Sequence, residues 1–160
     1  PVIALFSCKS SMSVDNSVVK KLDLQQYLGT WYEIARLDHR FERDMTQCTA
    51  TYTMEENGSI KVINRGMKDG ECRTSIGKGK VTKEPGVLRV SFFGPFYSDY
   101  RIMMVAADYS YALIGGSDED YLWILSRKPQ LKKNTRDYLV REAKERGYST
   151  DDLIWVKQTK

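Results

Sequence analysis

Few side chains in this sequence could do chemistry, and their spacing limits what that chemistry could be. The chain has three cysteines, Cys8, Cys48 and Cys72, and a single histidine, His39. The cysteines form no CxxC pair, so a zinc site built from Cys and His ligands is not predicted. Any Ser-His-Asp set would have to use His39. The residue types therefore favour binding over catalysis or metal chemistry.

Cys48 is the one candidate nucleophile inside a segment that alternates like a β-strand. A reactive thiol needs a pKa lowered by a nearby cation or a helix terminus. Its sequence neighbours, Gln47 and Thr49, supply neither. An enzyme that uses Cys48 as its nucleophile therefore remains the alternative, and a binding protein is the leading interpretation.

A dense run of charge, LDHRFERD at residues 37–44, offers a different kind of chemistry. His39, Arg40 and Arg43 could meet an anionic head group such as a phosphate. The alternative is a solvated loop held by its own ion pairs. The sequence leaves the role of this cluster open.

Size and composition bound the class of protein that carries these residues. The 160 residues predict one domain, with 41% hydrophobic and 29% charged residues. The net charge of +4 is spread along the chain without a basic stripe, so nucleic acid is not a predicted partner. Ten tyrosines and three tryptophans suit a β-rich fold or a ligand cavity, because these rings favour apolar surroundings with one wet edge.

The first residues resemble the end of a bacterial lipoprotein signal. Residues 5–8 (LFSC) are similar to a lipobox, in which the cysteine, here Cys8, is acylated and holds the protein on a membrane. The alternative is an apolar tail that ends in a buried cysteine. We therefore assign residues 1–7 to the tail of a signal peptide, 8–22 to a tether and 23–160 to the folded domain. Lys9 stands where an Asp would mark retention at the inner membrane, which favours the periplasmic face of the outer membrane.

The rest of the chain is a series of short alternating segments joined by tight turns. Asn57-Gly58 marks a hairpin, and no helical period interrupts the series before residue 134. The expected strands are 30–37, 48–54, 60–67, 73–81, 87–93, 97–106, 111–116 and 121–127. Sequential antiparallel strands of this number form a sandwich or close as an up-and-down barrel.

The period changes near the C-terminus. Residues 134–147 predict one helix, with Asn134 as N-cap, Gly147 as the stop, and an apolar stripe of Leu139, Val140 and Ala143 that would pack outside the barrel. Residues 153–158 (LIWVKQ) predict one further short strand.

Three motifs now identify a resemblance. Gly29-Thr30-Trp31 resembles the GxW motif of the lipocalin family, Ser98-Asp99-Tyr100 resembles its second motif, and Arg127 resembles the basic residue of the third. The likeness covers residues 24–158 and is greatest to the bacterial outer-membrane lipocalins, a subgroup that includes plant temperature-induced lipocalins and apolipoprotein D. The resemblance implies an all-β, eight-stranded antiparallel barrel with the C-terminal helix outside. It also implies that Trp31 plugs the closed end under Arg127, in a cation–π contact.

The alternation of strand residues then predicts which side chains line the barrel. If Trp31 points inward, Glu33 and Ala35 do so too. Counting back in twos from Arg127 adds Leu125, Trp123 and Tyr121. The family resemblance implies a further inward set: Tyr52, Val62, Asn64, Leu88, Val90, Phe92, Tyr100, Ile102, Met104, Ala112 and Ile114. Small residues such as Ala50, Gly77 and Gly79 would leave a cavity. A filled core without ligand is the alternative, and a β-bulge would reverse part of any strand.

The cysteine pair is the departure from the family pattern. Cys48 and Cys72 come near the same end of two strands, and a disulfide is conceivable in an oxidising periplasm. The two strands are separated by a third, however, which makes the span long for a disulfide. The pairing is left open.

The function that the resemblance implies is a lipid-anchored carrier of a fatty acid or lysophospholipid, serving membrane maintenance. An apolar wall with a few polar atoms is typical of a small-molecule site. No cofactor is expected, and the resemblance implies a homodimer. The resemblance also leaves two alternatives: a lipocalin-type enzyme that acts on a bound lipid through Cys48, and a pigment or haem carrier.

Overall fold

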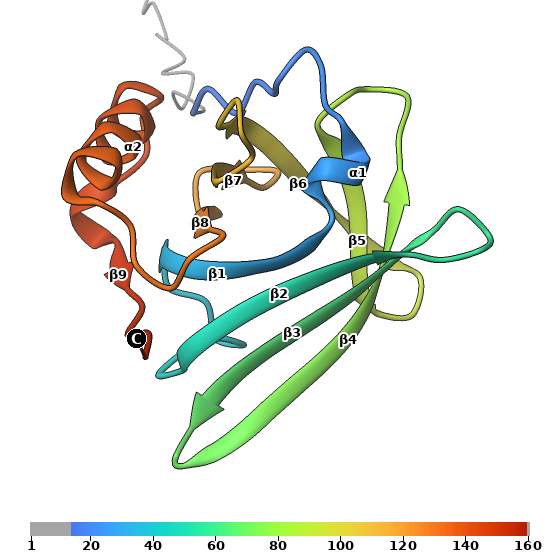
Figure 1. Ribbon diagram of the computed structural model, residues 1–160, viewed down its shortest axis with the longest axis horizontal. Coiled ribbons are helices and arrows are strands. Elements are labelled where there is room, and N and C mark those ends of the chain that lie inside the picture. The colour runs from blue at the N-terminus through green and yellow to red at the C-terminus, as the bar shows by residue number, and fades with distance from the viewer. Residues whose placement is uncertain (1–13, 160) are drawn as a thin grey trace, which may run out of the picture.

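The computed structural model describes residues 14–159, and their strands close into a single barrel (Figure 1). Each strand pairs antiparallel with the next in sequence, and β1 pairs with both β2 and β8, which closes the ring. The eight strands are β1 (Gly29–Arg36), β2 (Thr46–Met54), β3 (Ile60–Lys68), β4 (Glu71–Val81), β5 (Val87–Phe93), β6 (Phe96–Val105), β7 (Tyr111–Gly115) and β8 (Leu122–Ser126). The predicted eight-stranded antiparallel up-and-down lipocalin barrel is confirmed.

The hairpins form because apolar alternation and turn chemistry agree. In β3, Ile60 and Val62 are buried on either side of the exposed Lys61, the period of a strand with one face on a core. The preceding turn has Gly58 at φ +82°, a left-handed conformation that favours glycine, and the Asn57 side chain accepts from the Ser59 amide. The Asn57-Gly58 hairpin is therefore confirmed.

The barrel has one core inside and a second core outside. The outer core lies between the wall and helix α2 (Lys133–Glu145), where Leu139 and Ala143 are buried against Leu113 and Ile124. Figure 1 shows α2 beside the barrel, on the side away from the long strands β2, β3 and β4. The amphipathic stripe predicted this docking because a helix with one apolar face must bury it.

The ends of α2 agree only in part with the prediction. The helix begins at Lys133, and Asn134 is not the N-cap; its side chain accepts from the adjacent Thr135 amide. At the other end Gly147 adopts φ +99°, and its amide donates to the carbonyl of Lys144. Gly147 therefore stops the helix as expected.

The short final strand is β9 (Ile154–Trp155), which pairs with Ala35 and Arg36 of β1 where β2 has moved away. Beyond it, the Gln158 side-chain amide donates to the carbonyls of Glu33 (2.8 Å) and Cys48 (2.9 Å). The C-terminal segment thus bridges the two strands at the point where their ladder opens. The predicted strand over 153–158 is real but shorter.

Residues 14–22, assigned above to a tether, lie against the barrel. The Val19 amide donates to the carbonyl of Ile102 (3.0 Å), and Asn16 donates to the carbonyl of Gly116 (3.0 Å). This part of the predicted tether is therefore corrected to folded structure. Cys8 lies outside the described residues.

A four-residue helix, α1 (Leu24–Tyr27), follows this segment and was not predicted. The Asp23 side chain accepts from the Gln26 amide and caps the helix. One turn is too short to show a helical period in the sequence.

Candidate binding site

The closed end of the barrel is a plug of one indole and one guanidinium. Trp31 is fully buried, and Cζ of Arg127 lies 3.7 Å from its ring centroid. The guanidinium also donates to the carbonyls that end α1, those of Gln26 (2.7 Å), Tyr27 (3.0 Å) and Leu28 (2.9 Å). The structure therefore brings Trp31 and Arg127 together as predicted.

The other two motif residues support the same end from outside the core. Gly29 adopts φ +99°, and a Cβ there would lie 3.3 Å from Nη1 of Arg127, so glycine suits the position on two counts. Asp99 of β6 forms ion pairs with Arg89 and Arg101. These residues are structural and do not reach the interior.

Three tyrosines lie above the plug. Tyr27, Tyr52 and Tyr100 meet ring to ring with centroids 5.7–6.4 Å apart, and the hydroxyls of Tyr27 and Tyr100 share a hydrogen bond. Burial raises the pKa of all three phenols, so they remain neutral. They give the lower barrel a polar contact within an apolar wall.

Most of the predicted lining residues do face the interior. Those in or packed against the inner core are Tyr52, Val62, Leu88, Val90, Phe92, Tyr100, Ile102, Ala112, Ile114, Trp123 and Leu125. Asn64 is partly exposed and pairs with Ala50 and Ser75. The members nearest the plug are almost fully buried and packed against one another, so the base of the barrel is filled with side chains.

Two predicted lining residues face the other way, because each lies beside a register shift. In β1 the shift between Glu33 and Ala35 sends Ala35 to the outer core and brings Arg36 inside. In β6 the shift between Ile102 and Met104 sends Met104 outside and brings Val105 inside. A bulge adds one residue to a strand and reverses its alternation beyond that point.

The small residues do not leave the space that was predicted. A Cβ on Gly77 would lie 2.7 Å from the Phe92 ring, and a Cβ on Gly79 would lie 3.3 Å from Cβ of Ile60. Larger neighbours therefore fill the room that both glycines free. The structure instead has two hollows that open to the outer surface of the barrel.

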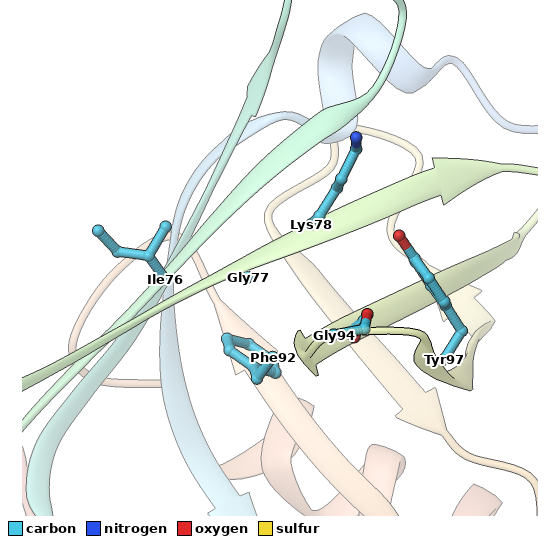
Figure 2. A pocket seen from close by; sticks show the side chains of 7 residues that line it. Ile76, Gly77, Lys78, Phe92, Gly94 and Tyr97 are labelled. Carbon is cyan, nitrogen blue, oxygen red and sulfur yellow. The ribbon is translucent and has the colours of Figure 1, made fainter.

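The first hollow, of about 310 Å³, lies where β4 separates from β5. The β4–β5 ladder starts at Lys78 and Ser91, and the earlier residues of β4 have no partner in β5. Figure 2 shows Lys78 and Tyr97 pointing to one side of the wall and Phe92 to the other. The second hollow, of about 470 Å³, lies between the β1–β2 loop and β9, and Asp38, Arg43 and Trp155 line it.

The mouth of the barrel holds a buried charged cluster that the sequence analysis missed. Arg36 is 1% exposed and donates to the Glu33 carboxyl (3.1 Å) and the Glu42 carbonyl (2.6 Å). Burial and the neighbouring Glu42 raise the pKa of Glu33 well above its usual range. Only the β1 bulge would have revealed Arg36, since simple alternation places it outside.

The charged run at residues 37–44 is partly a solvated loop, as one of the two alternatives predicted, and partly buried. Arg43 pairs with Asp38 at the surface (2.6 Å) and Arg40 is exposed, as a solvated loop with its own ion pairs would have them. His39 is buried, however, and stacks on Tyr121 with centroids 4.6 Å apart. Tyr121 precedes the first residue of β8, Leu122, so it lies in the loop and not on the barrel wall as predicted.

The cysteine bridge is not formed. Cys48 is a buried free thiol and Cys72 an exposed one. Cys72 pairs with Met67 of β3, and β3 lies between β2 and β4, so the intervening strand keeps the two thiols apart. The disulfide interpretation is corrected.

Large apolar side chains are exposed at the open end of the barrel. Three phenylalanines at the open end are exposed: Phe41, on the β1–β2 loop, by 64%, and Phe93 and Phe96, at the facing ends of β5 and β6, by 80% and 78%. Within residues 14–159, no helix has the length and apolar character needed to cross a membrane, and no group of three or more His, Cys, Asp or Glu side chains could hold a metal ion.

An eight-stranded barrel, stoppered by Trp31 and Arg127 and flanked by one C-terminal helix, defines a binding protein of the lipocalin type. The chain belongs to the lipocalin family, whose Lipocalin-like domain model matches residues 22–158. Members of this family bind small hydrophobic ligands.

Several relatives support this assignment. The chain is 46% identical to the outer membrane lipoprotein Blc of Citrobacter freundii, across 89% of this chain and 82% of that protein. It is 35% identical to temperature-induced lipocalin-1 of Arabidopsis thaliana, across 89% and 82%. The structure of insecticyanin from Manduca sexta is similar in fold, with a TM-score of 0.74 at 21% identity, across 90% of this chain and 85% of that one.

Proposed function

We propose that this protein carries one single-chain amphiphile, a fatty acid or a lysophospholipid, in the upper part of its barrel. The observation that carries the proposal is the gradient along the inner face, from an apolar base to the buried Arg36 at the mouth. Such a gradient suits an acyl chain with a polar head.

The ligand's chain would lie above the packed base, beside the inward residues that are only partly buried. These are Asn64, Val90, Phe92 and Trp123. An amphiphile that shifts these side chains would gain about 0.8 kcal/mol for each CH₂ group it buries. This placement keeps the Trp31 plug intact.

The proposed setting is the periplasmic face of the outer membrane, with the acyl anchor on Cys8 and a role in membrane maintenance. The names of the bacterial relatives support this location. The exposed Phe41, Phe93 and Phe96 at the mouth support exchange of ligand with a lipid surface, because large exposed apolar side chains mark contact sites. A homodimer remains part of the proposal.

The test is a lipid titration of residues 14–160 by calorimetry, using palmitate and 1-palmitoyl-lysophospholipid. Saturation at one molecule per chain is expected. Absence of binding by either lipid, from a protein whose circular dichroism shows intact β-structure, would refute the carrier function.

The enzymatic alternative gains no support from the site. Burial, with a smaller effect of Glu33, raises the pKa of the Cys48 thiol to about 12. A nucleophilic thiol needs the opposite shift. We therefore propose binding without catalysis.

A further inference from the structure

Two hydrogen-bond donors at the mouth of the barrel converge on one carboxylate, and one of them is not satisfied by it. The indole Nε1 of Trp123 donates to Oε2 of Glu42 at 3.1 Å. Nε of Arg36 lies 3.7 Å from the same oxygen and has no hydrogen-bond partner. A charged N–H donor reaches its acceptor at about 2.7–2.9 Å when the geometry is good. Glu42 is therefore a loose partner for a guanidinium that is 1% exposed.

A second unpartnered atom lies in the same cluster. His39 is 9% exposed, and its Nε2 has no hydrogen-bond partner. The ring is held between Phe41 and Tyr121, with centroids 5.2 Å and 4.6 Å away, and stacks on Trp123 at 5.4 Å. Buried polar atoms without partners are rare in folded proteins, and each one calls for an explanation.

The remaining edges of the guanidinium are occupied, which leaves its Nε edge for a ligand. Nη1 donates to the Glu33 carboxyl, and Nη2 donates to the Glu42 carbonyl at 2.6 Å. Burial raises the pKa of Glu33 well above its usual range, which makes Glu33 a weak ionic partner for Arg36. Glu42 belongs to the β1–β2 loop at the mouth, and 13% of its side chain stays exposed, so a rearrangement of that loop can displace it.

We propose that Arg36 and Trp123, beside the His39 ring that stacks on Trp123, form an oxyanion site for the head group of the bound amphiphile, and that Glu42 occupies this site when the barrel is empty. The ligand's carboxylate or phosphate replaces the Glu42 carboxylate and accepts from Nε of Arg36 and Nε1 of Trp123. The proposal rests on the carrier function proposed above and adds the head-group chemistry to it.

The test changes Glu42. If Glu42 competes with the ligand, removing its charge should tighten the binding of an anionic lipid; if Glu42 only supports the structure, removing its charge should not. In Glu42→Gln the competing charge is gone, but the side chain keeps its shape and an acceptor for Trp123. Palmitate should bind this variant about tenfold more tightly than wild type, which corresponds to about 1.4 kcal/mol. Neutral 1-monopalmitoylglycerol, with the same chain, should change by less than about twofold. Glu55→Gln, at an exposed turn between β2 and β3, is the matched control and should change neither affinity.

A donor variant supplies the reverse effect. Trp123→Phe keeps an aromatic ring in place and removes one N–H, so palmitate and lysophosphatidic acid should bind about threefold to tenfold more weakly than to wild type. Monopalmitoylglycerol should be little affected. Inorganic phosphate alone should compete weakly with palmitate, which separates a lipid head-group site from a site for free phosphate.

The outcomes separate this inference from the carrier function. If palmitate and monopalmitoylglycerol both bind wild type but Glu42→Gln leaves their affinity ratio unchanged or lowers it, the head-group site is refuted and the carrier survives. If inorganic phosphate binds as tightly as palmitate, the site serves a free anion and the proposal fails. If neither lipid binds folded wild type, both proposals fall together.

Discussion

Removing the Arg127 side chain should destabilise the whole barrel. Arg127 donates to the carbonyl of Thr30 at 2.9 Å and to three carbonyls at the end of α1, and it covers the Trp31 ring. A hydrogen bond to a charged group contributes about 1.5–3 kcal/mol, and a cation–π contact about 0.5–2 kcal/mol. These effects are not additive, and some carbonyls regain water, so we expect Arg127→Met to lower the free energy of unfolding by about 3–5 kcal/mol.

Urea denaturation followed by tryptophan fluorescence and circular dichroism measures this loss. Arg127→Lys keeps a cation over the ring but cannot reach four carbonyls, so it should lose about half as much. Arg141→Met, on the exposed side of α2, is the control and should change stability by less than about 0.5 kcal/mol. A loss below about 1 kcal/mol in Arg127→Met would refute the idea that this plug holds the closed end together.

Three other predictions concern Glu33, Gly77 and the free cysteines. The raised pKa of Glu33 means that the folded state binds more protons than the unfolded state above about pH 4.5, so this residue should make stability fall as pH rises. Glu33→Gln should therefore gain stability relative to wild type between pH 5 and 8, by at most about 1.4 kcal/mol per pH unit. Gly77→Ala should cost about 1–3 kcal/mol, because its Cβ would lie 2.7 Å from the Phe92 ring and 2.8 Å from the Ser91 carbonyl oxygen. In the native protein, the exposed Cys72 should react with a thiol reagent in seconds to minutes, and the buried Cys48 only after unfolding.

Each of these has a result that contradicts it. For Glu33, a stability difference between variant and wild type that stays flat from pH 5 to 8 would mean that the carboxyl is ordinary in the folded state. For Gly77, the milder neighbour Gly79→Ala is the control, and equal costs for the two variants would show that Phe92 yields freely. For the thiols, protection of both cysteines until a reductant is added would restore the disulfide.

The sequence predicted the strands and motif contacts well because those depend on local patterns. Alternation, the Asn57-Gly58 turn and the order of three motifs agree with one another, and such agreement specifies a fold. The helix over 134–147 followed from its apolar stripe for the same reason.

The polar part of the candidate site could not be predicted in the same way. Arg36 points into the barrel only because a bulge after Glu33 shifts the register, and the same kind of shift moves Met104 out. A bulge depends on how neighbouring strands meet, so no pattern within one strand reveals it. The predicted space beside Gly77 is wrong because Phe92, which comes from another strand, fills it.

Native mass spectrometry of the protein, isolated gently from its own membrane, shows whether the barrel carries one amphiphile. We expect a population heavier than the bare chain by the mass of one fatty acid or lysophospholipid. Organic extraction should remove this extra mass, and added palmitate should restore it. A spectrum that shows only the bare chain before extraction, and again after palmitate is added, would contradict the carrier function.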